Sequence, residues 1–151
     1  MIGQVVALAR NRGWEHDIVA SFQLAVAVPS PRFRSINSVE ICCSTDGDAW
    51  GLVMLQGFPV NTARSEETRK ALQHLNQSFA PARLDTLTYP DEFIKYALTI
   101  DKIQDVEKDL GRIIDDATHH LDFACSVLQL VNWGGKSADY AVAHVLALET
   151  Q

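Results

Sequence analysis

Apolar and polar residues alternate along one stretch near the start of the chain. Six apolar side chains fall on even positions between Ile18 and Val28. A period of two predicts a strand with one buried face, although part of this spacing would also suit one face of a helix. Pro29 and Pro31 end the strand, because proline has no backbone N–H to donate. The first dozen residues predict a short helix that stops at Gly13.

Two more strands are predicted before residue 59. Val39, Ile41 and Cys43 alternate with polar or small residues, and an Asp-Gly turn follows at 45–48. The next segment, Trp50–Phe58, is apolar at both parities. One side carries Trp50, Leu52, Met54 and Phe58, and the other carries Val53 and Leu55. A strand of this kind is usually central, and covered from both sides or by a partner subunit.

Helical spacing dominates the rest of the chain and is interrupted by one pair of strands. The predicted elements are a helix over 65–80, strands over 82–88 and 92–100, a long helix over 103–131, and a final helix that Ser137 caps. Residues 132–135, Asn-Trp-Gly-Gly, break the long helix.

This order of elements predicts the fold class. Strands joined by short turns pair antiparallel, and grouped helices and strands are typical of α+β folds. The sequence therefore predicts an antiparallel five-stranded sheet, in the order α-β-β-β-α-β-β-α-α, with the helices mainly on one face. With 151 residues, the chain is long enough for one substantial core, so we expect a single domain over 1–151.

The charge of the chain narrows the possible functions. Its net charge is −6, with 9 Lys+Arg against 10 Asp+Glu up to Leu98 and 4 against 9 from Thr99 onward. An acidic chain argues against nucleic-acid binding as the main function. No apolar run reaches membrane-spanning length, and the N-terminus has no secretory-signal pattern, so we expect a cytoplasmic protein without a membrane partner.

The three cysteines do not predict a disulfide framework. Their number is odd, and Cys42 and Cys43 are adjacent, so in a strand at most one of these two can lie in the core. Cys125 lies five and six residues after His120 and His119. This is the wrong offset for a Cys/His nucleophile on one helix face. The cysteines are therefore expected to be reduced, small hydrophobic residues.

The Gly-Gly-Lys-Ser at 134–137 is similar to part of a phosphate-binding loop. The full motif also needs a glycine where this chain has Leu130, and it follows a strand rather than a helix. We therefore interpret it as a glycine break followed by a serine helix cap. No cofactor is predicted.

Two other clusters suggest ligands. Asp115, His119 and Asp122 recur along one face of the long helix and could bind a divalent metal, in a small metal-dependent enzyme or a metal-binding regulator. A solvated helix face with i,i+4 pairs is the alternative. Arg32 and Arg34 flank Phe33 and could contact an acidic partner or a phosphate, or form a solvated loop.

The chain resembles the YbjN-like proteins, which share the type III secretion chaperone-like fold. The resemblance runs from Val5 to Leu130 and rests on element order and local features. These are Arg12-Gly13-Trp14 after the first helix, Leu75-Asn76 at the end of the second, Ala82-Arg83-Leu84-Asp85, and the strand Phe93–Ile100 that leads into the long helix. It implies a homodimer that binds other proteins, and it supplies no catalytic residues.

The resemblance and the residues together predict a non-enzymatic module. It would hold a protein client or regulatory partner against an apolar sheet surface. Aromatic residues are the usual anchors of such contacts, with packing in the core as the alternative for each. The candidates are Trp14, Phe22, Trp50, Phe58 and Trp133, together with Arg32 and Arg34.

Overall fold

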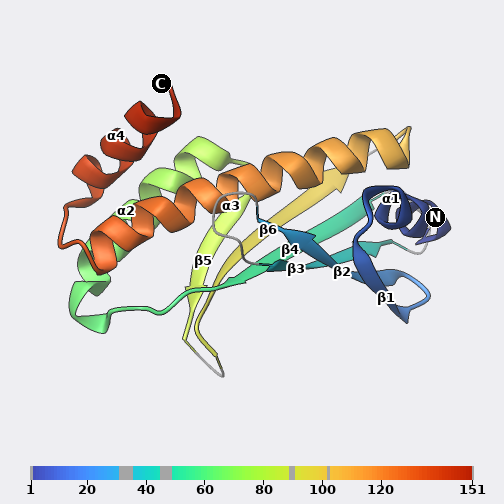
Figure 1. Cartoon of the computed structure of the whole chain (residues 1–151), viewed down its shortest axis with the longest axis horizontal. Coiled ribbons are helices and arrows are strands. Elements are labelled where there is room, and N and C mark those ends of the chain that lie inside the picture. Colours follow the sequence, from blue (N-terminus) through green and yellow to red (C-terminus); the bar gives the residue numbers. More distant parts are fainter. Residues whose placement is uncertain (1, 31–35, 45–48, 89–90, 102, 151) are drawn as a thin grey trace.

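Six antiparallel strands form one sheet, in the order β1-β2-β3-β4-β6-β5, in the computed structural model (Figure 1). The structure describes residues 2–30, 36–44, 49–88, 91–101 and 103–150. The strands are β1 (Glu15–Ala20), β2 (Gln23–Pro29), β3 (Ile36–Cys43), β4 (Ala49–Gly57), β5 (Arg83–Leu87) and β6 (Phe93–Asp101). The helices are α1 (Ile2–Arg12), α2 (Ser65–Phe79), α3 (Gly111–Asn132) and α4 (Ala138–Glu149), with short turns η1 (Thr62–Arg64) and η2 (Val106–Leu110).

The prediction of five strands was wrong, because the stretch Ile18–Val28 is a hairpin rather than one strand. It turns at residues 21–22 and pairs β1 with β2. At the turn Ala20 pairs with Gln23, an even position with an odd one. A register shift between Ile18 and Ala20 then moves the pairing by one residue, so that Ile18 pairs with Leu24. From there even positions pair with even positions and face the same side in both strands. The period of two therefore continues through the turn and hides it.

Most of the other predicted elements are present. The structure confirms an antiparallel α+β fold, and β4 is central, between β3 and β6. The long helical run is also confirmed, although it begins with the π-helical turn η2 before α3. The predicted Asp-Gly turn at 45–48 lies outside the described residues. No helix among those described is both long and apolar enough to cross a membrane.

The core lies between one face of the sheet and the helices. Figure 1 shows α3 along the length of the sheet, with α2 and α4 toward one end and α1 at the other. Most of the largest fully buried side chains come from the strands and from α3 with its preceding turn, with Val5 of α1 and Leu75 of α2 beside them. They include Leu24, Ile41, Leu52, Met54, Ile94, Leu110, Ile114, Leu121 and Leu128. Burying such a side chain contributes about 1.5–3 kcal/mol, so the α3–sheet contact carries much of the stability.

Polar contacts fix the position of α3 within this apolar layer. The Ser30 hydroxyl donates to Asp122 Oδ1 at 2.6 Å. Asn132, at the end of α3, accepts from the Asn61 backbone N–H at 3.1 Å and from the Thr68 hydroxyl at 3.2 Å. By contrast, Asn37 on β3 is fully buried, and neither Nδ2 nor Oδ1 has a hydrogen-bond partner among the described residues.

We expect Asn37→Val to stabilise the protein. A buried amide without partners costs about 1–3 kcal/mol, and valine favours a strand, so the free energy of unfolding should rise by an amount of this order. Urea unfolding followed by circular dichroism measures the change.

Asn132→Val is the matched control, because it removes an equally buried amide that has partners. It should lower the free energy of unfolding by about 1–3 kcal/mol, since two donors then lose their acceptor. If both variants were destabilised equally, the Asn37 amide would have partners in solution and the expectation would be wrong.

Candidate protein-binding surface

No helix of the described residues covers one face of the sheet, and we call this face the open face. Its side chains come from the alternate strand positions that point away from the core. Two rows cross all six strands in register. One row is Glu15, Ala27, Ser38, Leu55, Lys95 and Asp85; the other is Asp17, Ala25, Glu40, Val53, Ala97 and Arg83. These residues are exposed or half-buried. In β2, β3 and β4 their strand neighbours are buried, whereas in β1 Ile18 and Val19 are 65% and 57% exposed, so the expectation of a buried Ile18 was wrong.

The centre of the open face is apolar and its ends are charged. Val53 and Leu55 of β4 and Ala97 of β6 are half-buried there. The prediction that Trp50–Phe58 is apolar on both sides is therefore confirmed, and its second side has no cover among the described residues. Isolated exposed apolar residues are common, but an apolar strip across a sheet indicates a contact surface.

A groove of about 620 Å³ lies at the β1 end of the open face. Ala25 and Ala27 form its floor, with β1 on one side and β3 on the other. Alanine extends only one carbon from the backbone, so β2 is lower than the strands beside it. The groove thus follows from the choice of small residues on one face of a single strand.

Three acidic side chains of the described residues lie around this groove, and the Arg12 guanidinium lies over the Trp14 ring at its end. Glu15 and Asp17 line it, and Glu40 lies opposite Ala25 on β3. All three are exposed, and none makes an ion pair with another described residue. Their charges are therefore available to a ligand.

The predicted aromatic anchors separate into two groups. Trp50 and Phe58 are buried in the core, with 3% and 4% of their surface exposed, so they pack rather than bind. Phe22 is exposed at the β1–β2 turn, and Trp133 is exposed while its indole N–H donates to the Pro59 carbonyl. Trp14 is half-buried, lines the groove, and has the Arg12 guanidinium over its ring at 5.4 Å.

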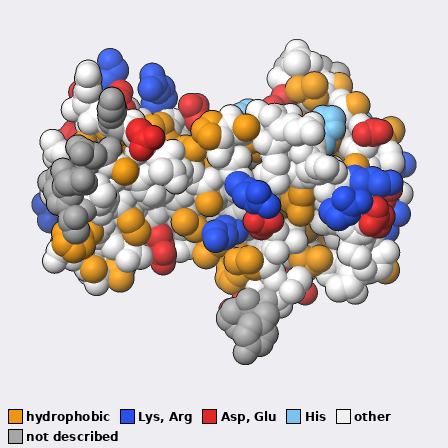
Figure 2. All heavy atoms as spheres, turned by 180° about the vertical axis from the view of Figure 1, so that it is seen from behind, with side chains coloured by type: hydrophobic (Ala, Val, Ile, Leu, Met, Phe, Trp, Pro, Cys, Tyr) orange, Lys and Arg blue, Asp and Glu red, His pale blue; other side chains and the backbone are white. Residues whose placement is uncertain are grey.

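Arg32, Phe33 and Arg34, the predicted basic contact, lie outside the described residues. The surface in Figure 2 carries acidic and basic side chains next to each other, with hydrophobic patches between them. The described residues on this face therefore form no continuous basic surface.

The three predicted metal ligands do not meet. Asp115 pairs with Arg12 at 2.9 Å, His119 lies 3.4 Å from Glu149, and Asp122 is buried against Ser30. Among the described residues, no group of three or more His, Cys, Asp or Glu is placed to hold a metal ion. Separate partners explain these side chains better than a shared ligand does.

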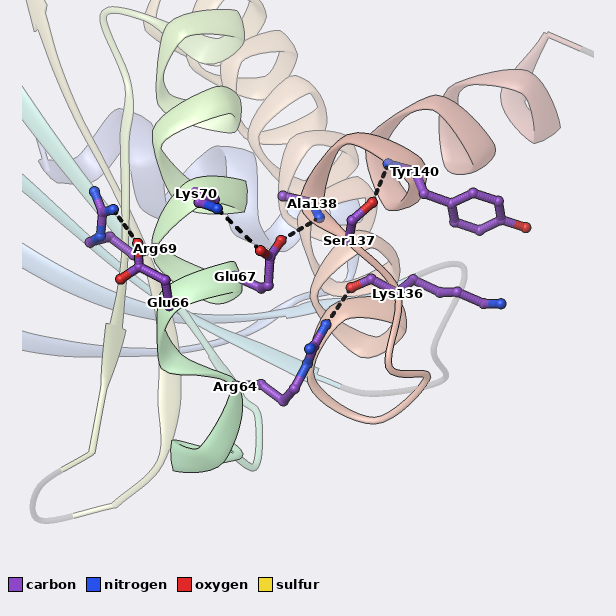
Figure 3. Close-up of polar contacts among 9 residues, drawn as sticks. All are labelled: Arg64, Glu66, Glu67, Arg69, Lys70, Lys136, Ser137, Ala138 and Tyr140. Atoms are coloured by element: carbon purple, nitrogen blue, oxygen red, sulfur yellow. Dashed lines mark hydrogen bonds and ion pairs between the residues drawn. The ribbon is translucent and has the colours of Figure 1, made fainter.

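The Gly-Gly-Lys-Ser segment connects α3 to α4, as interpreted from the sequence (Figure 3). Ser137 caps α4 by accepting from the Tyr140 N–H, and the Glu67 carboxylate accepts from the Ala138 N–H at 3.0 Å. A side chain of α2 thus occupies the anion position at this helix start. The Arg64 guanidinium donates to the Lys136 carbonyl at 2.7 Å and holds the connection against α2.

The cysteines behave as small structural residues. Cys43 and Cys125 are buried and Cys42 is exposed, which confirms that at most one of the adjacent pair lies in the core. Burial, with Asp122 nearby, raises the pKa of Cys125 to about 12, and its thiol donates to Gln56 Oε1 at 3.0 Å. Cys125 is therefore poorly suited to act as a nucleophile.

His120 is the histidine with the most contacts. Its ring stacks on Phe79 at 4.2 Å, and its Nδ1 lies 2.9 Å from the Tyr96 hydroxyl. Burial, helped by Asp116, raises the pKa of Tyr96 to about 12, so its hydroxyl is protonated and can donate to a neutral imidazole. Burial also lowers the pKa of His120, although Asp116 opposes this shift.

Sequence reasoning did not identify the groove residues Glu15, Asp17, Ala25 and Ala27. The signal was present, because they are the odd-numbered partners of the alternation that predicted a buried face. Their neighbourhood depends on the hairpin, which brings β1 beside β2, and the hairpin was not predicted.

No protein-family model and no curated protein matches the sequence. Among solved structures, the chain is similar to the crystal structure of YbjN, a candidate transcription regulator from E. coli. The two share 11% sequence identity at a TM-score of 0.55, over 86% of this chain and 90% of the other. At this identity the likeness shows the fold alone, so the predicted resemblance is confirmed as a YbjN-like fold.

Cys42 should be the one cysteine that reacts with Ellman's reagent in the folded protein. Partial burial, followed by Glu40 and Cys43, raises the pKa of Cys42, so its reaction should need a higher pH than that of glutathione. Glu40→Gln should lower that pH. Cys42→Ser should abolish the native reaction, and reaction of a second thiol before urea is added would contradict the placement of Cys43 and Cys125.

Stability should fall as the pH drops below about 6.5. Because the pKa of His120 is lowered in the folded state, the unfolded chain binds the proton more tightly in this range. His120→Gln should flatten the pH dependence of the unfolding midpoint, and His74→Gln, at an exposed site on α2, should not. Equal slopes for wild type and His120→Gln would show that another group is responsible.

Proposed function

We propose that this chain is a non-enzymatic module that holds a protein partner against its open face and acts as a homodimer. The observation that supports this most is a six-stranded sheet with helices on one side and an apolar strip on the other. The fold neighbour YbjN is a candidate transcription regulator, and a regulatory role through protein contacts is compatible with the shared fold.

The size of the open face supports the proposal. Six strands at about 4.8 Å spacing and about seven residues of 3.4 Å give an area of about 700 Å². Stable protein interfaces bury about 800 Å² on each partner. The open face is therefore large enough to supply most of one interface.

Two other functions have less support. Direct nucleic-acid binding is disfavoured by the net charge of −6 and by the exposed carboxylates of Glu15, Asp17 and Glu40 on the open face. A metal-dependent activity is disfavoured because Asp115, His119 and Asp122 each have a separate partner.

Binding should require the apolar centre of the open face. Phage-displayed random peptides selected on the wild-type protein should bind Val53→Lys at least tenfold more weakly, because the lysine places a charge within the contact. Leu146→Lys, at an exposed apolar position of α4, should bind as the wild type does. If no peptide is enriched, or if Val53→Lys binds equally well, the open face is not the binding surface.

The homodimer is tested separately by light scattering over a range of protein concentrations. We expect a mass of twice the monomer's 16.7 kDa. A monomer mass at every concentration would rule out the homodimer. The proposal that the open face binds a partner would then still be tested by the peptide experiment.

A further inference from the structure

The groove at the β1 end of the open face has the chemistry to select a particular class of partner. From its floor of Ala25 and Ala27 and its carboxylates, which form no ion pair with any described residue, we infer that it takes a cationic, extended segment of a protein partner, with arginine or lysine at alternate positions. This inference rests on the proposed function and specifies the partner for one part of the same surface.

The spacing of the carboxylates matches an extended chain. Glu15 and Asp17 are two residues apart on one face of β1, which places their Cα atoms about 7 Å apart. Alternate residues of an extended peptide repeat at the same distance. Two arginines separated by one residue can therefore each face one of these carboxylates.

The width of the groove matches one cationic side chain. Asp17, Ala25 and Glu40 are neighbours in register across β1, β2 and β3, so Asp17 and Glu40 are about 10 Å apart at Cα. Ala25 leaves the space between them empty. A guanidinium in this space can contact a carboxylate on each side while its methylene stem lies on the alanines.

The groove disfavours other occupants. A second copy of β1 paired antiparallel about Asp17 would place the two Asp17 side chains opposite each other, and like charges in that position repel. An acidic segment is repelled in the same way. A small free amine fits the charges but leaves most of the 620 Å³ groove unfilled, so an extended segment gains more contact.

The test uses the wild-type protein and a fluorescein-labelled ten-residue peptide with arginine at every second position and serine or valine between. Fluorescence anisotropy should show saturable binding that weakens several-fold as sodium chloride rises from about 0.05 to 0.5 M. The same peptide with glutamate for arginine should not bind. Arginine methyl ester, as the small-amine source of the same charge, should compete only at concentrations at least a hundredfold higher.

Variants locate the contact. Asp17→Lys and Glu40→Lys should each weaken peptide binding at least tenfold, whereas Asp91→Lys, with the same change in net charge at an exposed site outside the groove, should stay within twofold. The peptide should also slow modification of Cys42, which lies two residues from Glu40 on the same face. An equal effect of all three substitutions, or no protection of Cys42, would overturn the inference.

The two proposals fail in different ways. If the arginine peptide does not bind while library peptides still depend on Val53, the cationic partner is wrong and the open-face function stands. If Val53→Lys leaves the library peptides unaffected, the open-face function fails whatever the arginine peptide does.

Discussion

The burial of α3 against one face of the sheet is the contact on which the rest of the structure depends. This helix covers the sheet along its length, α2 and α4 pack beside it, and α1 meets it through Arg12 and Asp115. Its C-terminal end and its middle are fixed by polar contacts of Asn132 and Asp122. Because the helices gather around α3, none of those in the described part of the chain covers the opposite face. The open face is therefore a consequence of how the core is completed.

The side chains on the open face limit the aggregation that an uncovered sheet would otherwise favour. Small residues such as Ala25 and Ala27 keep the apolar area of β2 low, and carboxylates on β1 protect an edge strand that could otherwise pair with another chain. Lys95 and the Arg83–Asp85 pair do the same at the other end of the sheet. The charges that protect the edge strands also influence which partners can bind, because they repel segments of like charge and attract segments of opposite charge.

The sequence predicted the fold class because its signals are local. Alternation marked the buried sides of β3 and β4, and helical spacing marked α2 and α3. The hairpin at residues 21–22 was not predicted, because its loop contains neither glycine nor asparagine. In addition, the register shift before Ala20 lets apolar residues stay on even positions in both strands, so the alternation shows no break. The groove could not be predicted for the same reason, since it exists only once β1 lies beside β2. Trp50 was predicted as a partner-binding anchor but is buried in the core. Aromatic type alone therefore does not distinguish a residue that binds a partner from one that packs in the core.

The Arg12–Asp115 contact joins residues that are 103 positions apart, and it has a consequence for the order of folding. Closing so long a loop is slow, and α1 has no partner on α3 until most of the chain has left the ribosome. Strands β1 to β4 are made well before the helix that covers their buried side. A growing chain therefore exposes the buried sides of these strands, including Leu24, Ile41 and Leu52, until α3 has been made, and this exposure favours aggregation during synthesis.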